Sequence, residues 1–414
     1  MTTSAEGSRV PRLAVVVSHP IQYHSPWFRL LAATGAVDLK VFYLWDFGVE
    51  PRFDRQFGRS IQWDIPLLDG YEHEFVANSS PDPGTHHFGG LRNPDLVERL
   101  HNWRPDAILL FGYLFRSHFD VMFSRRLRGI PMLLRGDSHE LFRPPGPRSM
   151  LKRWARSALF RRFDAFLAVG AANAGYFRRS GAPESKIHFA PHCVDNERFQ
   201  GAAPEAIREA AEWRRQMGIA ENSPVVLFAG KFEGKKRPLD LVKAFGVALE
   251  RLRQDAGPQA ALLLLGSGDL EGRLRAAAGD QLNRTVFVAP FQNQSRMPCV
   301  YAACDVFVLP SYGSEETWGL AVNEAMNLGK PAIVSSHVGC GPDLVQPGET
   351  GWIFPAGDTG ALADVLVHAI SMDGSLRAKM GAAARRRVSA YSYEAATAGL
   401  LRAVSGLVAC PRDT

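Results

Sequence analysis

Short apolar runs alternate with helical segments over most of the chain, and this alternation restricts the fold more than any other feature. In the first half the runs are residues 13–17, 37–44, 107–111, 132–134, 165–169 and 187–190. A second series comprises residues 225–228, 261–265, 285–289, 306–309, 332–334 and 351–354. Apolar strands that alternate with helices are typical of parallel sheets with right-handed crossovers. The sequence therefore predicts an α/β protein with a sheet in each half.

The two series are separated by residues 191–224, which hold a turn, an Ala/Glu/Arg-rich helical segment and a Ser-Pro pair. A chain of 414 residues is long enough for two or three domains. We expect two doubly wound, Rossmann-like domains that face each other across a cleft. The expected bounds are 1–198 for an N-terminal domain, 199–392 for a C-terminal domain, and 393–414 for a final helix that packs back toward the N-terminal domain.

Residues 310–331 place a polar, glycine-containing loop between an apolar strand and a helix that ends at Gly329. Thr317 is the expected N-cap of this helix. Free N–H groups and the helix dipole at such an N-terminus attract anions. Glu316 and Glu324 flank the spot, roughly 12 Å apart along a helix. Carboxylates repel a diphosphate, so they would contact sugar hydroxyls, which indicates a nucleotide sugar. Alternatively, Glu316 is a first-turn dipole residue and Glu324 lies on a solvated helix face.

Two lysines, Lys231 and Lys236, follow the strand 225–228 on a loop that contains glycine. Ammonium groups at the carboxyl end of a strand can neutralise a diphosphate. A solvated basic loop explains the two residues equally well on their own. The helix N-terminus expected in the same domain makes the phosphate interpretation the better one.

Other nucleotide-binding patterns are incomplete. The stretch Gly266-Ser-Gly-Asp-Leu-Glu-Gly272 resembles a dinucleotide fingerprint, but its third glycine comes one residue late and no acidic residue ends the strand 285–289. We therefore interpret it as a tight turn and disfavour a nicotinamide-dependent oxidoreductase. No Asp-x-Asp occurs in the chain, so a metal-clamped diphosphate lacks its usual carboxylate pair and no metal is expected.

Together these motifs resemble the family 4 glycosyltransferases of the GT-B fold, over about residues 186–400. Glu316 and Glu324, with seven residues between them, match the family's signature. Lys231 and Lys236 match its Arg/Lys pair, and Phe291, after Pro290, matches its base-contacting turn. A glycine-rich turn at residues 339–351 also fits. The chain departs from the pattern in having Asp343 where Glu is usual and Cys193 where Gly is usual.

The resemblance implies a retaining transfer of a sugar from a UDP- or GDP-sugar to a hydroxyl acceptor, with no required cofactor or metal. The C-terminal domain would bind this donor and the N-terminal domain the acceptor, a lipid-linked or polysaccharide glycan. The implied donor-binding residues are Lys231, Lys236, Phe291, Glu316, Thr317, Trp318, Gly319, Leu320 and Glu324. Within this set, the lysines would hold the diphosphate, Glu316 the donor sugar and Glu324 the ribose.

The first half matches the family less closely. Its first loop reads His19-Pro-Ile-Gln-Tyr23 instead of a Gly-Gly pair, and we expect His19, Gln22 and Tyr23 on the acceptor side, although Tyr23 also fits a core position. A family histidine after the strand near residue 134 corresponds to Asp137 or His139. His139 is slightly preferred, and both remain candidates, with Glu316, for the catalytic side.

The excess positive charge of +6 lies entirely in residues 1–200, which hold 26 Lys and Arg against 20 Asp and Glu. Residues 141–163 contain seven basic residues and no acid, with Leu151, Trp154, Ala155, Ala158 and Leu159 at helical spacing. Such a helix either contacts an anionic membrane or packs on the sheet with a solvated basic back, and we favour packing. A pattern of stacked aromatic residues interleaved with basic ones is not recognised, so nucleic acid is not expected as a partner.

Five cysteines form no Cys-x-x-Cys pair, the N-terminus fits no signal peptide, and no run of 18 apolar residues occurs. We therefore expect a cytoplasmic protein, peripheral at the inner face of the membrane if its basic helix contacts lipid. Three rival functions share the predicted fold: transfer to a soluble small-molecule acceptor such as a secondary metabolite, nucleotide-sugar hydrolysis or epimerisation, and nucleotide-sugar binding without catalysis.

Overall fold

The N-terminal half forms a seven-stranded parallel sheet in the order β5-β2-β1-β6-β7-β8-β9. The computed structural model describes residues 9–54, 59–142 and 147–408. The strands of this sheet are β1 (Arg12–Val17), β2 (Asp38–Tyr43), β5 (Glu72–Phe75), β6 (Ala107–Phe111), β7 (Met132–Gly136), β8 (Ala165–Ala168) and β9 (Ile187–Phe189). A separate antiparallel pair consists of β3 (Arg52–Asp54) and β4 (Arg59–Ile61).

Both faces of the first sheet are buried, as a doubly wound fold requires. Leu13 and Val15 of β1 pack in one cluster with α1 and the final helix, whereas Ala14 and Val16 pack in another with the helices of the opposite face. This alternation follows from the two-residue period of a strand. The helices of this half are α1 (Ser25–Ala33), η1 (Phe88–Gly90), α2 (Leu96–Trp103), α3 (Arg116–Met122), α4 (Pro147–Phe160), α5 (Ala171–Arg179) and η2 (Glu184–Lys186).

The second half forms a six-stranded parallel sheet in the order β12-β11-β10-β13-β14-β15. Its strands are β10 (Val225–Ala229), β11 (Ala261–Leu265), β12 (Val286–Ala289), β13 (Val306–Leu309), β14 (Ala332–Ser335) and β15 (Gly351–Phe354). The chain moves outward from β10 to β12 and then returns to place β13 on the other side of β10. This reversal creates a crevice at the carboxyl ends of β10 and β13, where open α/β sheets bind ligands.

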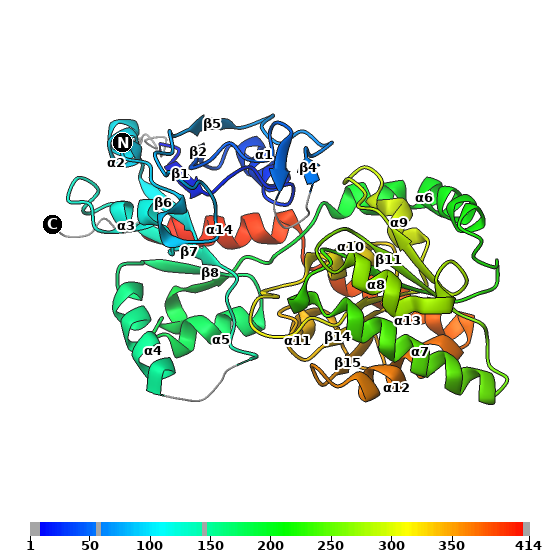
Figure 1. Ribbon diagram of the computed structural model, residues 1–414. Helices are drawn as coiled ribbons and strands as arrows, with labels where there is room; N and C mark the ends of the chain where they lie inside the picture. Colours follow the sequence, from blue (N-terminus) through cyan, green and yellow to red (C-terminus); the bar gives the residue numbers. More distant parts are fainter. Residues whose placement is uncertain (1–8, 55–58, 143–146, 409–414) are drawn as a thin grey trace, which may run out of the picture.

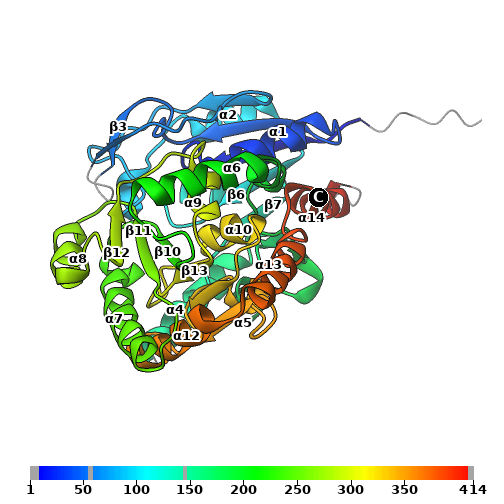
Figure 2. The same ribbon diagram turned by 90° about the vertical axis from the view of Figure 1, so that its right-hand side faces the viewer.

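Helices cover both faces of the second sheet and connect it to the first (Figures 1 and 2). They are α6 (Asn196–Gln216), η3 (Gly234–Lys236), α7 (Pro238–Gln254), α8 (Glu271–Ala278), η4 (Gly279–Gln281), α9 (Met297–Ala302), α10 (Leu320–Asn327), α11 (Gly341–Leu344), α12 (Thr359–Ser371), α13 (Gly374–Val388) and α14 (Tyr393–Val408). Helix α14, red in Figure 1, lies against α1 and β9 of the N-terminal half. There Trp27 Nε1 donates a hydrogen bond to Thr397 Oγ1 at 3.0 Å.

The two parallel sheets and their interleaved helices confirm the predicted fold class. Each apolar run singled out in the sequence forms a strand, with ends that differ by at most two residues. The sequence did not predict β3, β4 or β5, which lie in the segment 45–95. Strand β5 pairs only with β2, at the edge of the sheet, so its residues do not form an apolar run.

The expected packing of the basic helix on the sheet is wrong for most of its apolar stripe, of which only Leu159 packs against a core cluster of the first sheet. Of segment 141–163, residues 143–146 lie outside the described residues, and α4 follows. Phe160 at the end of α4 is buried, but Leu151 and Trp154 are 68% and 70% exposed. Two further residues of the predicted stripe, Ala155 and Ala158, are also exposed. Within the described ranges, no helix is long and apolar enough to span a bilayer.

Candidate active site

A cavity of about 440 Å³ lies between the two domains, and loops from both of them line it. The C-terminal domain contributes the loops that follow β10, β11, β12 and β13, together with α10. The N-terminal domain contributes the loop after β1, together with Phe47 after β2 and Trp63 after β4. Because the loops after β1, β2, β10, β11, β12 and β13 start at the carboxyl ends of parallel strands, residues far apart in sequence meet at one edge. The predicted residues that line the cavity are His19, Gln22, Tyr23, Lys231, Lys236, Phe291, Glu316, Gly319, Leu320 and Glu324.

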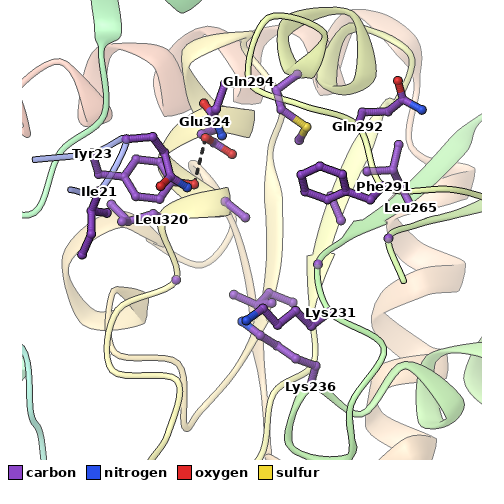
Figure 3. A pocket seen from close by; sticks show the side chains of 18 of the residues that line it. Ile21, Tyr23, Lys231, Lys236, Leu265, Phe291, Gln292, Gln294, Leu320 and Glu324 are labelled. Atoms are coloured by element: carbon purple, nitrogen blue, oxygen red, sulfur yellow. Dashed lines mark hydrogen bonds between the residues drawn. The ribbon is translucent and has the colours of Figure 1, made fainter. Parts of the chain in front are cut away.

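Lys231 and Lys236 lie on the loop that follows β10, where Figure 3 shows their ammonium ends directed to the same part of the cavity. The Lys236 ammonium forms an ion pair with the Glu316 carboxylate. Ser311 Oγ donates a second hydrogen bond to Glu316 Oε2 at 2.7 Å. Both contacts fix the Glu316 carboxylate beside the lysines, so this part of the cavity combines positive charge with the Glu316 carboxylate.

Helix α10 begins at Leu320, three residues after the predicted cap, and Gly319 is its N-cap with φ of 101°. A Cβ at Gly319 would lie 2.8 Å from Leu309 Cδ2 and 3.1 Å from Val338 Cγ1, so this left-handed turn requires glycine. The prediction that Thr317 caps the helix is therefore wrong. Thr317 Oγ1 instead donates to Asp137 Oδ2 of the N-terminal domain at 2.7 Å.

Trp318, the residue between Thr317 and Gly319, is also directed away from the cavity. Its side chain is buried, and Nε1 donates to Asn323 Oδ1 at 2.8 Å. Neither Thr317 nor Trp318 lines the cavity, whereas Gly319, Leu320 and Ala321 do. Any contact of the α10 N-terminus with a ligand therefore comes from residues 319–321, so Gly319 and Leu320 of the predicted set line the cavity and Thr317 and Trp318 do not.

Glu324 is only 2% exposed, so the alternative of a solvated helix face is wrong. Its carboxylate accepts hydrogen bonds from the hydroxyls of Tyr301, at 2.6 Å, and Tyr23, at 3.2 Å. Burial raises the pKa of Glu324, and the hydrogen bonds from the two tyrosines offset part of this rise. The Tyr23 bond, dashed in Figure 3, crosses between the domains. Tyr23 thus joins the loop after β1 in the N-terminal domain to helix α10 of the C-terminal domain.

Asp137 and His139, which follow β7, both contact the loop that carries Glu316. His139 is buried, and its Nε2 lies 3.1 Å from the Glu316 carbonyl oxygen; burial lowers the pKa of His139. Desolvation opposes ionisation of Asp137, but its contacts with His192 and Thr317 lower the Asp137 pKa to about 2. Neither side chain lines the cavity. Both hold the loop 316–317 against the N-terminal domain.

The two departures from the family pattern have structural partners. The Asp343 carboxylate accepts hydrogen bonds from the Ala171 backbone N–H at 3.0 and 2.9 Å and from the Tyr391 hydroxyl at 2.9 Å. Asp343 therefore satisfies the N-terminus of α5 in the other domain. Cys193 is buried in the cluster that contains β1, α1 and α14.

Several cavity residues were not identified from the sequence: Phe47, Trp63, Gln294, Met297 and Tyr301. Phe47 and Trp63 lie in the segment 45–95, for which the sequence predicts no regular element. Their aromatic side chains were the only sequence signal that could have marked them as cavity residues. Gln294, Met297 and Tyr301 lie after β12, and Arg198 fixes Gln294 by donating to its backbone oxygen and to Oε1, each at 2.8 Å.

Comparison with known proteins identifies two family models along the chain. "Glycosyl transferases group 1" matches residues 209–387, and "Glycosyl transferase 4-like domain" matches residues 71–193. D-inositol 3-phosphate glycosyltransferase of Nocardia farcinica is 30% identical over 232 residues, covering 54% of this chain and 48% of the relative. GDP-mannose-dependent monoacylated alpha-(1-6)-phosphatidylinositol monomannoside mannosyltransferase of Corynebacterium glutamicum is 28% identical over 256 residues, covering 60% and 63%. The chain spans about half the length of most curated relatives it matches.

Solved structures of the same fold cover almost the whole chain. A glycosyltransferase from Rickettsia africae has a TM-score of 0.71 at 16% identity and covers 98% of this chain and 100% of its own. Anabaena HepE, solved with UDP and glucose, has a TM-score of 0.69 at 18% identity and covers 96% and 100%. Identities this low establish the fold alone, whereas the family models match in sequence. The chain therefore belongs to the GT-B glycosyltransferases, in the group related to family 4.

Proposed function

We propose that the protein is a retaining glycosyltransferase that moves a sugar from a UDP- or GDP-sugar to a hydroxyl acceptor. The observation that carries this proposal is the placement of Lys231, Lys236, Glu316 and Glu324 around one cavity between the domains. The lysines supply charge for a diphosphate, and the carboxylates supply acceptors for sugar hydroxyls. HepE was solved with UDP and glucose, and the Corynebacterium relative is named as GDP-mannose-dependent, which supports this class of donor.

The chemistry requires stabilisation of the departing nucleoside diphosphate. As the bond from the anomeric carbon to the diphosphate oxygen breaks, negative charge grows on that oxygen beside Lys231 and Lys236. The acceptor oxygen forms its bond on the same face of the sugar, and its proton passes to the departing phosphate oxygen. Glu316 holds the donor sugar, and Glu324 holds the ribose. Asp137 and His139 act as positioning groups through the loop 316–317.

A panel of UDP- and GDP-sugars with candidate acceptors tests the reaction. A transferase releases nucleoside diphosphate at full rate only when an acceptor is present, and the anomeric configuration of the product matches that of the donor. A hydrolase or epimerase consumes donor at the same rate without acceptor, and a non-catalytic binding protein consumes none. Either result would contradict glycosyl transfer.

The nicotinamide alternative is disfavoured by the turn after β11. Gly266 has φ of 151°, and a Cβ there would lie 1.9 Å from the Gly230 carbonyl oxygen. This glycine is explained by the close approach of two loops of the C-terminal sheet. Titration with NADH, followed by cofactor fluorescence, is expected to show no binding.

Transfer should not depend on a divalent metal, because the chain contains no Asp-x-Asp pair to clamp a metal on the diphosphate. In the described part of the chain, the one group with metal-ligand spacing is Asp82, His86 and His87, and none of these residues lines the cavity. Activity is therefore expected to be unchanged after dialysis against EDTA. Loss of activity that Mg²⁺ or Mn²⁺ restores would show that the lysines do not suffice.

The proposed acceptor is a lipid-linked glycan at an anionic membrane surface, reached through α4. Met150, Leu151 and Trp154 on this helix are 62%, 68% and 70% exposed, and Lys152 on the helix and Arg161 just after its end are exposed too. Exposed apolar and aromatic side chains flanked by basic ones fit a membrane interface. Each basic residue near such a surface contributes about 1 kcal/mol, so attachment should be salt-sensitive.

Replacing Lys152, Arg153 and Arg161 together with glutamate should release the protein from anionic vesicles and leave nucleoside diphosphate affinity unchanged. Arg156 is not replaced, because it pairs with Glu140 at 2.9 Å inside the domain. The matched control reverses three basic residues of the C-terminal domain, Arg273, Lys379 and Arg386, which are exposed as well. High salt should release the wild type, because the Debye length falls to about 3 Å at 1 M.

Vesicle co-sedimentation at low salt gives the result. If the wild type does not co-sediment with anionic vesicles and glycosylates a neutral soluble acceptor efficiently, the exposed face of α4 has no membrane role. A small-molecule acceptor then becomes the better proposal.

A further inference from the structure

A short segment of the N-terminal domain, residues 62–64, lies directly against the loop that follows β12 in the C-terminal domain. Asn293 Nδ2 donates to the Gln62 carbonyl oxygen at 2.6 Å, and the Ser295 backbone N–H donates to Asp64 Oδ1 at 3.1 Å. The Ser295 hydroxyl also donates to the Asp64 carboxylate. These polar contacts join two segments that are more than 200 residues apart in sequence, and they fix the residue between Gln62 and Asp64.

That residue is Trp63, whose indole is half-buried and lines the cavity. Its ring centroid lies 6.2 Å from that of Phe291, with an angle of 62° between the ring planes. On another side the indole is backed by Gly48, with φ of 90°, where a Cβ would lie 3.4 Å from Trp63 Cδ1 and Nε1. The indole is thus held between two loops with part of its surface left toward the cavity.

The end of the cavity next to Trp63 differs chemically from the rest. We call it the aromatic end and define it by Trp63, Phe291, Gln292 and Met297, all of which line the cavity. These side chains offer aromatic rings, a thioether and an amide, and none carries a charge. In Figure 3, Phe291 and Gln292 lie apart from both the lysines and Glu324. A diphosphate at the lysines and a ribose at Glu324 leave the aromatic end for the nucleobase.

We propose that Trp63 is a base-contacting residue, so that the N-terminal domain supplies one wall of the nucleobase subsite. This inference rests on the proposed nucleotide-sugar donor. A nucleobase presents a flat π-face, and indole is well suited to pack against it. The base is then enclosed between Trp63 of one domain and the loop 291–297 of the other. Donor recognition thereby uses both domains, although the phosphate and ribose contacts come from the C-terminal domain.

Two probes separate contact with the base from general support of the site. Inorganic pyrophosphate occupies only the diphosphate region, whereas UDP and GDP also occupy the aromatic end. Trp63→Ala should weaken UDP or GDP binding by about tenfold or more, in line with the loss of a base-stacking aromatic residue. The affinity of the same variant for pyrophosphate should change by less than about twofold, because the ammonium groups of Lys231 and Lys236 are still present.

Tryptophan fluorescence gives a readout of contact itself. Binding of UDP or GDP should quench wild-type emission, and Trp63→Phe should remove this quenching while retaining much of the affinity. Trp154→Phe is the matched control, because Trp154 is exposed on α4 and does not line the cavity. UDP or GDP should quench the emission of this variant as much as that of the wild type. If Trp63→Ala does not fold, the Trp63→Phe fluorescence result decides alone.

Three results would overturn the inference. Unchanged nucleotide affinity and quenching in the Trp63 variants would show that this indole only packs between domains. Equal loss of pyrophosphate and nucleotide affinity would show that it supports the whole site and not the base. Absence of UDP and GDP binding in the wild type would overturn the proposed donor together with Trp63, and this outcome differs from the first two, in which the wild type binds.

Discussion

Replacing Lys236 with alanine is expected to lower turnover by about 10²-fold or more, because the variant loses a charge that stabilises the departing diphosphate. The structure indicates a second unfavourable effect of this substitution. Lys236 is the ion-pair partner of Glu316, so its removal leaves a carboxylate beside the diphosphate with less positive charge to balance it. Nucleoside diphosphate affinity should therefore fall as well. Steady-state kinetics with the donor and calorimetry with the diphosphate measure the two effects.

Lys243→Ala is the matched control for this variant. Lys243 lies exposed on α7, after the same loop, and does not line the cavity. Its loss should leave turnover and affinity within about twofold of the wild type, as is usual for surface substitutions. If Lys236→Ala binds and turns over like the wild type, the loop after β10 is ordinary surface and the phosphate site lies elsewhere.

Glu316 and Glu324 are expected to give different kinetic profiles. Glu316→Gln should lower kcat by about 10²- to 10³-fold if its contact with the donor sugar tightens during transfer. Glu324→Gln should mainly raise the donor KM, by about 10- to 100-fold, because it weakens a charged hydrogen bond to the ribose. Glutamine is preferred to alanine at position 324 because truncation would leave the hydroxyls of Tyr23 and Tyr301 without their acceptor.

The comparison of kcat and KM for the two variants measures this difference. Tyr301→Phe is a useful control, since it removes one donor to Glu324 without removing the carboxylate. It should move KM in the same direction as Glu324→Gln and by less. Identical profiles for the Glu316 and Glu324 variants would contradict separate contacts with sugar and ribose.

Most of the fold was predictable because both sheets are built from buried parallel strands. Such strands read as continuous apolar runs, and the loops after them necessarily meet at one edge. Lys236, Glu316 and Glu324 therefore came together as the spacing predicts. Strands β3 to β5 were missed because an edge strand and a short hairpin carry no comparable run of apolar residues.

The finer geometry depended on contacts that no local pattern contains. Thr317 is a good N-cap by residue type, but the close approach of Leu309 and Val338 makes Gly319 the cap. Sequence offset could not separate Asp137 from His139, and the structure uses both to hold the loop 316–317. Trp63 is held at the cavity by polar contacts between segments that are distant in sequence. The periodicity of the sequence does not predict such contacts.

Exposure of the α4 face was likewise beyond the sequence pattern. An apolar stripe at helical spacing predicts burial in most helices, because such a stripe usually faces the core. In α4 the buried end is Phe160, while Leu151 and Trp154 stay exposed. A stripe of this kind has the same spacing whether or not it packs on the protein, so the sequence pattern alone does not predict its exposure.

Calorimetric titration of the wild type with UDP, GDP and ADP tests the central claim most directly. The donor site is predicted to bind UDP or GDP at one site per chain, with an affinity that Lys236→Ala reduces strongly and Lys243→Ala does not. Absence of binding by all three nucleoside diphosphates, in a protein shown to be folded, would contradict a nucleotide-sugar site in this cavity.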